Sequence, residues 1–342
     1  MYGMHAVLLM EKDMKKIWIS MDPQRLDIQY LVECLKAKGF DAYAKKVSTA
    51  DREYVEEAKK VDAAIVGIER WDRDALHAVK DHLGFLMRKG AGYDLVDIPA
   101  ATEFGIPVMN IPGVNATAVA EMALLHILNA ARQMTWTIKK QLENPAYITS
   151  AEKFFGGEVD QATVGIVGYG SIGRELARLL SGFHTRILVF DAYRKPEEDG
   201  RIEIADSMEQ VFRESDYISL HIPSLPSTQK LINMRYFQMM KPTACIVNTA
   251  RGQILDEDDL YTALEQGVIR FAGLDVVCKE PITAEERLLQ LDRVCITPHI
   301  AGDSVESRNR SNEIIIQTCV DFFEGKIPAN IVNKEVIPKL HI

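Results

Sequence analysis

A glycine-rich turn lies near the middle of the chain and has the spacing of a phosphate-binding loop. Residues 162–167, Ala-Thr-Val-Gly-Ile-Val, read as a short strand. The pattern G-x-G-x-x-G follows at Gly168, Gly170 and Gly173, and residues 174–180 read as the start of a helix. The first glycine permits a tight turn, the second lets the backbone approach the phosphates, and the third lets the helix pack against the strand. The free N–H groups at the helix N-terminus then attract the pyrophosphate of a dinucleotide.

A carboxylate follows the next apolar run, at the distance that such a site requires. Residues 186–190 form this run, and Asp191 comes 18 residues after Gly173. A carboxylate there accepts hydrogen bonds from the ribose hydroxyls and repels a 2′-phosphate, so the sequence predicts NAD rather than NADP. A bare glycine pattern is often only a flexible turn. The flanking strand, the helix and the acid carry the prediction.

Three side chains of different chemistry occur later, each just after an apolar run that reads as a strand. They are Arg251, Glu280 and His299. In open α/β sheets, ligands bind beyond the carboxyl ends of the strands. Reduction of a 2-oxo acid needs a cation for the carboxylate and the carbonyl, a proton donor with a pKa near neutrality, and a group that keeps this donor charged and oriented. The guanidinium, the imidazole and the carboxylate fit these roles in turn.

Each of the three residues also has a simpler interpretation. An arginine at a strand end usually lies at the surface or forms an ion pair, and a single histidine is more often structural than catalytic. Glu280-Pro281 could simply end an element of secondary structure. Only their joint placement beside a nucleotide pattern favours the catalytic interpretation.

The length, composition and net charge limit the classes of protein to which the chain can belong. The chain has 342 residues, which suggests two domains, and 47% of them are hydrophobic. Its net charge of −9 argues against nucleic acid and against an anionic membrane surface as partners, because both attract basic proteins. A small anionic substrate is not excluded, since one arginine suffices to bind it.

Cysteine usage and apolar segments point to the cytoplasm. The five cysteines are scattered singly, without zinc spacing, which predicts free thiols, a reducing compartment and no metal site. Cys245 and Cys295 lie within apolar runs and are expected to be buried. The apolar stretch at residues 6–10 is too short, and too soon followed by acids, for a secretory signal. The longest apolar helix, at residues 116–131, contains a glutamate, a histidine and an asparagine and is no membrane span.

Strands and helices alternate along the chain, which predicts parallel sheets. In the first hundred residues, strands are expected at residues 16–21, 41–46, 63–68 and 83–89. Helices are expected from Asp22-Pro23 to Gly39 and near residues 49–60 and 71–80, while residues 1–14 are ambiguous. One long helix is expected from Asn115 to Glu143, where Asn144-Pro145 ends it. Later strands are expected at residues 217–222, 245–249, 271–276 and 294–297, and a final helix at residues 305–323.

From about residue 63 to residue 333, the chain resembles the D-isomer-specific 2-hydroxyacid dehydrogenase family. Seven motifs occur in register, at residues 88–97, 105–115, 119–121, 168–173 with Asp191, 240–252, 273–281 and 297–302. The family often has Asn where this chain has Leu95, and Gly where it has Ala301. Neither departure touches a chemical group.

The resemblance implies an α/β fold of two Rossmann-like open parallel sheets. An NAD-binding domain, residues 116–303, would be inserted into a discontinuous substrate-binding (catalytic) domain of residues 1–115 plus 304–342. The active site would lie between the two domains. The chain would be a short, phosphoglycerate dehydrogenase-like form without a regulatory domain, and family members usually form homodimers through the region of residues 115–143.

The resemblance also implies roles for individual residues. Arg251, Glu280 and His299 would be catalytic, and Ala91, Gly92 and Arg251 would bind the substrate. NAD would be bound by Gly168, Gly170, Ser171, Ile172, Gly173, Asp191, Pro223, Thr249, Arg251, Asp275, His299 and Gly302. NADH would transfer hydride to C2 of a 2-oxo acid while His299 protonates its oxygen, with Glu280 keeping the imidazole charged.

The substrate itself stays open at this point. D-3-phosphoglycerate, glyoxylate or hydroxypyruvate, and D-lactate-type acids are candidates. Gly67 falls where some phosphoglycerate enzymes place an arginine, although Arg70 could serve a phosphate instead. The alternative is an NAD(H)-sensing corepressor on the same fold, which could keep all three catalytic residues. A formate dehydrogenase would be expected to have Gln at position 280.

Overall fold

The computed structural model describes residues 14–146, 156–193 and 200–340. The chain divides into two compact units, Met1–Val114 with Val305–Ile342, and Asn115–Ser304. We call them unit 1 and unit 2. The expected domains were 1–115 plus 304–342, and 116–303; the roles assigned to these domains stay predictions. Of the ambiguous segment at residues 1–14, all but Met14 lies outside the described residues.

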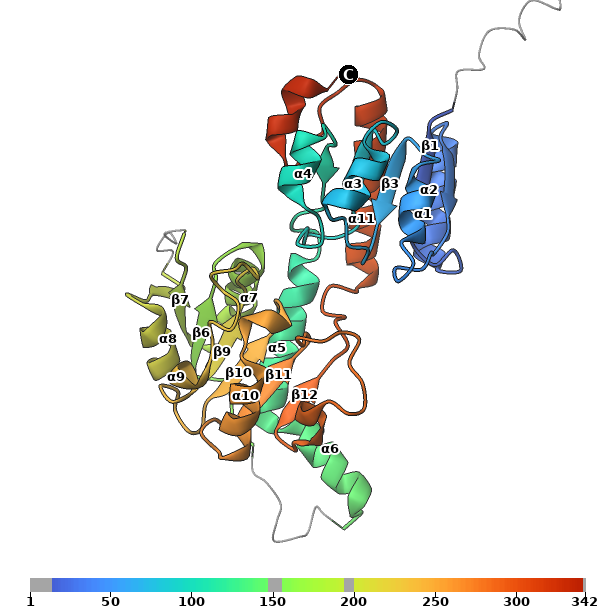
Figure 1. The fold of residues 1–342 in the computed structure, drawn as a ribbon. Coiled ribbons are helices and arrows are strands. Elements are labelled where there is room, and N and C mark those ends of the chain that lie inside the picture. Colours follow the sequence, from blue (N-terminus) through green and yellow to red (C-terminus); the bar gives the residue numbers. More distant parts are fainter. Residues whose placement is uncertain (1–13, 147–155, 194–199, 341–342) are drawn as a thin grey trace, which may run out of the picture. The chain divides into compact units, whose positions relative to one another are not determined.

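Unit 1 contains a parallel sheet of five strands in the order β2-β1-β3-β4-β5. The strands are β1 Lys16–Ile19, β2 Asp41–Ala44, β3 Ala63–Val66, β4 Phe85–Arg88 and β5 Val108–Met109. Helices cover both faces of this sheet (Figure 1). Ile17 and Ile19 face a core formed with α1 Leu26–Ala37 and α11 Val305–Phe323. Trp18 points the other way, into a core with α2 Glu53–Ala58, α3 Arg73–Val79 and α4 Ile98–Glu103.

Two predictions for unit 1 need correction. The first helix begins at Leu26 rather than at Asp22, because Asp22 forms a turn in which its carboxylate accepts a hydrogen bond from the N–H of Gln24 at 2.8 Å. The short elements α4 and β5 were not expected. A side-chain cap starts α4, where Asp97 accepts from the N–H of Ala100 at 3.0 Å.

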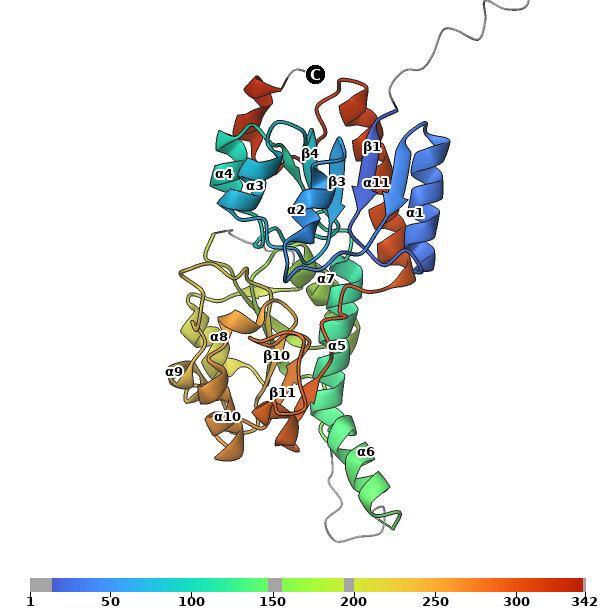
Figure 2. The ribbon, with the colours of Figure 1, turned by 45° about the vertical axis from the view of Figure 1, so that its right-hand side comes forward.

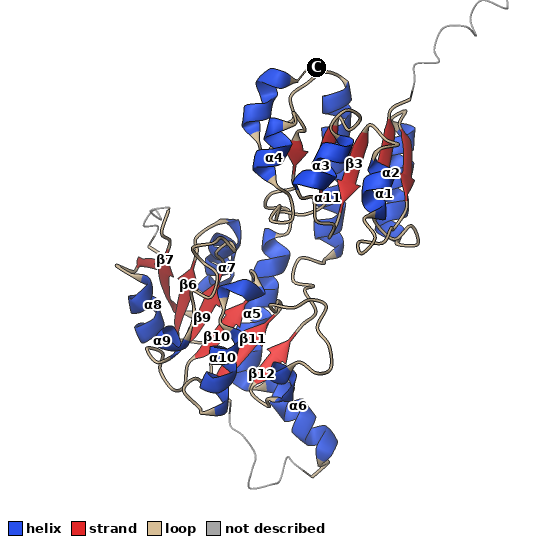
Figure 3. Cartoon of the chain, viewed as in Figure 1, coloured by secondary structure: helices blue, strands red, loops and turns tan. Residues whose placement is uncertain are grey.

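Unit 2 contains a parallel sheet of seven strands in the order β12-β11-β10-β9-β6-β7-β8 (Figure 3). The strands are β6 Thr163–Val167, β7 Arg186–Phe190, β8 Glu203–Ile204, β9 Tyr217–Leu220, β10 Cys245–Asn248, β11 Phe271–Leu274 and β12 Val294–Ile296. The predicted strands are confirmed, except that the two-residue β8 was not expected. The order in which the chain adds strands reverses between β6 and β9: β7 and β8 lie on one side of β6, and β9 to β12 lie on the other. Open sheets of this kind bind nucleotides at such a switch point.

The helices of unit 2 again cover both faces of its sheet (Figure 2). One face packs against α5 Ala116–Arg132 and α7 Ser171–Leu180. The other face packs against α8 Met208–Glu214, α9 Met234–Phe237 and α10 Glu257–Glu265. Both parallel sheets therefore agree with the predicted fold class.

The single long helix expected over residues 115–143 is in fact two helices. Gln133 adopts a left-handed conformation, with φ 48°, and separates α5 from α6 Met134–Glu143. Asn129 stabilises the break, because its side-chain oxygen accepts a hydrogen bond from the N–H of Thr135 at 3.0 Å. No residue of α6 is buried, so this helix projects from the body of unit 2 (Figure 1).

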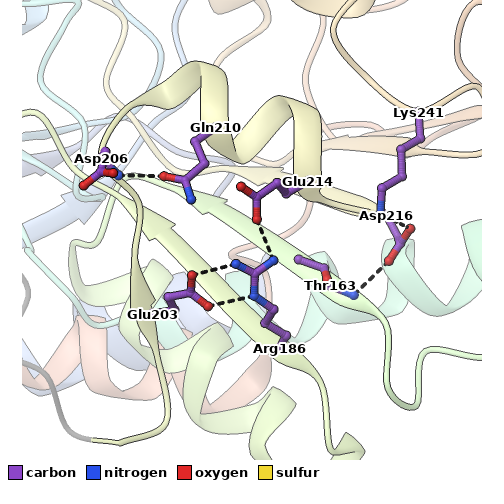
Figure 4. Close-up of polar contacts among 8 residues, drawn as sticks. All are labelled: Thr163, Arg186, Glu203, Asp206, Gln210, Glu214, Asp216 and Lys241. Atoms are coloured by element: carbon purple, nitrogen blue, oxygen red, sulfur yellow. Dashed lines mark hydrogen bonds and ion pairs between the residues drawn. The ribbon is translucent and has the colours of Figure 1, made fainter.

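Ion pairs gather at the amino ends of the unit 2 strands (Figure 4). Arg186, the first residue of β7, pairs with Glu203 at 2.6 Å and with Glu214 at 2.7 Å. Asp216 accepts from the N–H of Thr163 at 2.9 Å and pairs with Lys241 at 2.8 Å. Such partly exposed pairs contribute little stability each. These ion pairs lie at the amino ends of the strands, whereas ligands of such sheets bind at the carboxyl ends.

The described residues contain no helix that is long and apolar enough to cross a membrane. All five cysteines are free, and Cys245 is buried as expected. Cys295 is partly exposed rather than buried, because β12 is an edge strand of the sheet.

A close contact between α5 and β11 gives a prediction about stability. A Cβ atom added at Gly273 would lie 2.8 Å from the Cβ of the buried His126. We expect Gly273→Ala to destabilise unit 2 by about 1–3 kcal/mol through overpacking, measured by thermal or urea unfolding. Gly182→Ala is the matched control, since no atom lies within 4 Å of its added Cβ. Equal stability of the two variants would contradict this packing.

Candidate active site

The three side chains that the sequence predicts to be catalytic follow neighbouring strands of unit 2. Arg251 comes after β10, Glu280 after β11, and His299 after β12. These strands are adjacent and parallel in the sheet, so their carboxyl ends lie at one edge. The topology therefore brings together residues that are nearly fifty positions apart in the sequence.

His299 and Glu280 form an ion pair. Nδ1 of His299 lies 2.7 Å from Oε2 of Glu280. This hydrogen bond raises the pKa of His299 above its ordinary value, against the opposing effects of burial and of the Arg251 charge. Burial alone would raise the pKa of Glu280, but its contacts with His299 and the charge of Arg251 lower it overall. The pair thus favours an imidazolium beside a carboxylate.

Arg251 is placed by two backbone features. Its main-chain oxygen accepts a hydrogen bond from Nδ2 of Asn248 at 2.9 Å, and its Nη1 donates to the oxygen of Ala250 at 2.7 Å. The next residue, Gly252, packs so closely on the loop after β11 that a Cβ atom would overlap the backbone of Val277. The loop that carries Arg251 and the loop that carries Glu280 are therefore held in direct contact.

Asp275 supports the loop that carries His299. Its buried carboxylate accepts hydrogen bonds from the N–H of Ile300 at 3.0 Å and of Ala301 at 2.8 Å. It also accepts from the hydroxyl of Thr297, and its main-chain oxygen accepts from the N–H of His299 at 2.8 Å. His299 has a left-handed conformation, with φ 55°, which these bonds stabilise. The structure thus places the Asp275 side chain beneath the loop that carries His299.

Two further residues, Thr297 and His126, connect Asp275 to α5. Sequence reasoning did not identify either of them as part of the site. Nε2 of His126 lies 3.3 Å from the hydroxyl of Thr297. Burial lowers the pKa of His126, although the charge of Asp275 acts in the opposite sense. His126 lies on α5, far from Thr297 in the sequence, so no local pattern could reveal the contact.

The glycine turn has the surroundings that its predicted roles require. Gly168 has φ 97°, and an added Cβ would lie 2.6 Å from the main-chain oxygen of His221. A Cβ at Gly173 would overlap the oxygen of Gly168, which explains the close packing of helix on strand. No atom lies within 4 Å of the position of a Cβ at Gly170, so the backbone there is open to a ligand. α7 begins at the next residue, Ser171.

Asp191 is tied to the same turn. Its Oδ2 accepts a hydrogen bond from the N–H of Tyr169 at 2.7 Å, and its Oδ1 accepts from the N–H of Tyr193 at 2.9 Å. An ionised carboxylate offers about four acceptor positions. It therefore keeps the capacity to accept bonds from ribose hydroxyls while it orients the turn.

Two buried polar atoms at this edge fit a polar ligand. Within the described chain, Oγ1 of Thr249 and Nδ1 of His221 have no hydrogen-bond partner. The register of Leu220 with Asn248 places these two residues side by side at the ends of β9 and β10. Burial lowers the pKa of His221 to about 4, so its ring is neutral at pH 7. Unpartnered buried polar atoms are costly, and the site as a whole suits a nicotinamide dinucleotide.

Other predicted site residues are placed as follows. Pro223 lies in the loop after β9, and Gly302 lies close to Asn115, where a Cβ would approach Nδ2 to 2.9 Å. Ala91 and Gly92 belong to unit 1, in the loop after β4. The structure thus groups the expected cofactor and catalytic residues on unit 2. Of the three expected substrate residues, Ala91 and Gly92 lie on unit 1 and Arg251 lies on unit 2.

Comparison with known proteins identifies the family of the chain. The family model described as "D-isomer specific 2-hydroxyacid dehydrogenase, NAD binding domain" matches residues 124–301. The glyoxylate reductase of Thermococcus litoralis is 35% identical over 297 residues, which cover 83% of this chain and 87% of that protein. The glyoxylate reductase of Korarchaeum cryptofilum is 37% identical over 257 residues, which cover 75% and 77%.

Solved structures agree with the fold. D-mandelate dehydrogenase of Rhodotorula graminis matches with a TM-score of 0.83 at 26% identity, over 94% of this chain and 98% of that chain. The apo-structure of D-lactate dehydrogenase from Escherichia coli matches with a TM-score of 0.79 at 28% identity, over 93% and 100%. The chain therefore belongs to the D-isomer specific 2-hydroxyacid dehydrogenase family, whose members are NAD-dependent oxidoreductases that interconvert a 2-hydroxy acid and its 2-oxo acid.

Proposed function

We propose that this enzyme reduces a small 2-oxo acid of the glyoxylate or hydroxypyruvate type. The observation that carries the catalytic part is the 2.7 Å contact of His299 with Glu280, on the same sheet as the glycine turn. The 35–37% identity to archaeal glyoxylate reductases supports the choice of substrate.

Each side chain has one task in the proposed mechanism. Bound NADH supplies the hydride that reaches C2 of the substrate. Arg251 binds the substrate carboxylate and polarises the carbonyl oxygen. Oε2 of Glu280 accepts a hydrogen bond from Nδ1–H of His299, which leaves the Nε2–H of the imidazolium to protonate the carbonyl oxygen. In the reverse direction, the neutral imidazole acts as the base.

The loop after β3 contains Gly67, at the position where some phosphoglycerate enzymes place an arginine, and its composition favours a substrate with a small, uncharged substituent. Ile68 is 76% exposed there, and the buried Glu69 accepts hydrogen bonds from Ser20 and from the N–H of Gly67. Arg70 is the single cation among these residues and lies beside that carboxylate in the sequence. A phosphate would need more positive charge, so phosphoglycerate is the less favoured substrate.

A panel of 2-oxo acids tests the proposal. We expect NADH oxidation with glyoxylate and hydroxypyruvate at ordinary enzyme rates, and lower kcat/KM with pyruvate and with 3-phosphohydroxypyruvate. His299→Gln should lose about 10²–10⁴-fold in kcat and keep NADH affinity within a few-fold, since a general acid contributes this much. The measurement is NADH absorbance, with NADH binding followed by fluorescence.

The outcomes of this panel separate the alternatives. Tight NADH binding with negligible turnover of every acid would overturn the proposed function and favour the sensing role. Near-normal turnover by His299→Gln would remove His299 from the mechanism.

The ion pair gives a pH-dependent prediction. Reduction needs a protonated His299, so kcat/KM should fall as pH rises through its pKa. Glu280→Gln removes the carboxylate charge that raises this pKa. Burial and the charge of Arg251 still lower the pKa, and the charge of Asp275, which raises it, is a smaller effect. The fall in kcat/KM should therefore occur at lower pH in this variant. Glu285→Gln is the control, because it removes a charge from the same loop but its side-chain partner is Thr283. An unchanged pH profile in Glu280→Gln would contradict the role of that residue.

We propose that the enzyme is a homodimer that uses α6. Met134, Ile138 and Leu142 are 48%, 53% and 80% exposed, and their spacing of four residues places them on one face. Leu125 on α5 is also exposed. A second copy of the chain would cover this stripe, as the family resemblance implies.

The dimer prediction concerns the exposed apolar stripe of α6. Ile138→Glu combined with Leu142→Glu should convert a dimer to a monomer by light scattering, because two buried carboxylates are costly. Glu143→Lys, on the opposite side of α6, should leave the dimer intact. A monomeric wild-type protein would overturn this arrangement.

The cellular location is also a proposal. All five cysteines are free, which suits a reducing compartment such as the cytoplasm. Burial raises the pKa of the Cys319 thiol to about 12, so that residue is an unreactive core side chain.

A further inference from the structure

The loop after β4 in unit 1 has three successive carbonyl groups that are all held by hydrogen bonds. The oxygen of Gly90 accepts from the N–H of Ile111 at 2.9 Å. The oxygen of Ala91 accepts from Nδ2 of Asn110 at 2.7 Å. The oxygen of Gly92 accepts from Nε of Arg88 at 3.3 Å. Three donors from two different segments thus determine the orientation of this short loop.

A fixed carbonyl also fixes the N–H of the following residue. The two groups belong to one planar trans peptide and point in opposite directions. The bond to the oxygen of Ala91 therefore aims the N–H of Gly92, just as the bond to the oxygen of Gly90 aims the N–H of Ala91. No acceptor for these two amides is found among the described residues. Both residues are partly exposed, so an anion can approach them.

Asn110 is itself rigidly placed. Its side chain is largely buried, with 8% of the residue exposed. Its main-chain oxygen accepts a hydrogen bond from Nδ2 of Asn330 at 2.8 Å, and its N–H donates to the oxygen of Asn330 at 3.4 Å. Asn330 in turn bonds to Thr318 of α11 at 3.4 Å. A chain of side-chain amides and a hydroxyl thus connects the C-terminal helix to the loop.

We propose that Asn110 is a positioning residue for substrate binding. Its side-chain amide holds the Ala91–Gly92 peptide so that the N–H of Gly92 faces the carboxylate of the 2-oxo acid. Arg88 holds the next peptide, Gly92–Tyr93, and so fixes Gly92 from its other side. This inference rests on the proposed function, in which Ala91 and Gly92 bind that carboxylate through their amides.

Steady-state kinetics of Asn110→Ala test the proposal. A misdirected amide weakens substrate binding equally in the ground state and the transition state, so KM should rise with little change in kcat. We expect KM for glyoxylate to increase about tenfold or more, kcat to change less than about threefold, and the dissociation constant of NADH to stay unchanged. Arg88→Met should shift KM in the same direction and provides a second variant should Asn110→Ala fold poorly.

Asn333→Ala is the matched control. Asn333 is a buried asparagine of unit 1 that accepts from the N–H of Val108 at 2.8 Å and donates to the oxygen of Ile106 at 3.0 Å. Both asparagine variants should lower the melting temperature, but only Asn110→Ala should raise KM. An equal KM in the two variants would show that Asn110 acts on stability alone and would overturn the inference.

The wild-type enzyme separates this failure from failure of the proposed function. If wild type reduces none of the 2-oxo acids, the proposed function is wrong and the inference falls with it. If wild type is active and KM is unchanged in both Asn110→Ala and Arg88→Met, only the positioning role is wrong. Oxamate, which resembles a 2-oxo acid but is not reduced, should show the same loss of affinity as an inhibitor of Asn110→Ala.

Discussion

In the proposed mechanism, the chemistry depends on the hydrogen bond between His299 and Glu280. This bond raises the pKa of His299, which favours the imidazolium, and it would leave the other ring nitrogen for the substrate. The bond exists because two loops from neighbouring strands meet at a defined distance. Asp275 holds the loop of His299 through backbone amides, and Gly252 lets the loop of Arg251 pack on the segment before Glu280. The parallel order of β10, β11 and β12 makes both contacts geometrically possible.

In both units, a buried polar side chain at the carboxyl edge of the sheet orients a loop through hydrogen bonds to its backbone. In unit 2, the carboxylate of Asp275 accepts bonds from backbone N–H groups and so orients a reactive side chain. In unit 1, the amide of Asn110 donates to a backbone oxygen and so orients a backbone N–H. A peptide group that is held on one side presents its other side in a fixed direction, without the entropy cost that a long side chain would incur. Recognition by backbone amides therefore needs buried polar residues behind it.

The sequence predicted the strands and the glycine turn, because each of these features depends on residues that are neighbours along the chain. Buried parallel strands are continuous apolar runs, and the glycine turn needs residues without a Cβ atom at set positions. The break between α5 and α6 was not predictable, because Gln133 is neither glycine nor asparagine and its left-handed conformation depends on Asn129 and Thr135. The supporting roles of Asp275 and Asn110 were also hidden. Their partners come from other loops, and only the folded chain brings them together.

The supporting residues and the reacting residues differ in burial, and this difference separates stability from activity. Asp275 is 1% exposed and Asn110 is 8% exposed, whereas the His299 and Glu280 side chains are 50% and 36% exposed. A buried polar group that loses its partners costs folding free energy, while a half-exposed ion pair contributes little to it. The reacting groups can therefore be exposed to ligands at small cost to the fold. Asp275 and Asn110 matter more for the folding free energy, because they are buried. The same hydrogen bonds pair backbone groups and fix the direction in which those groups point.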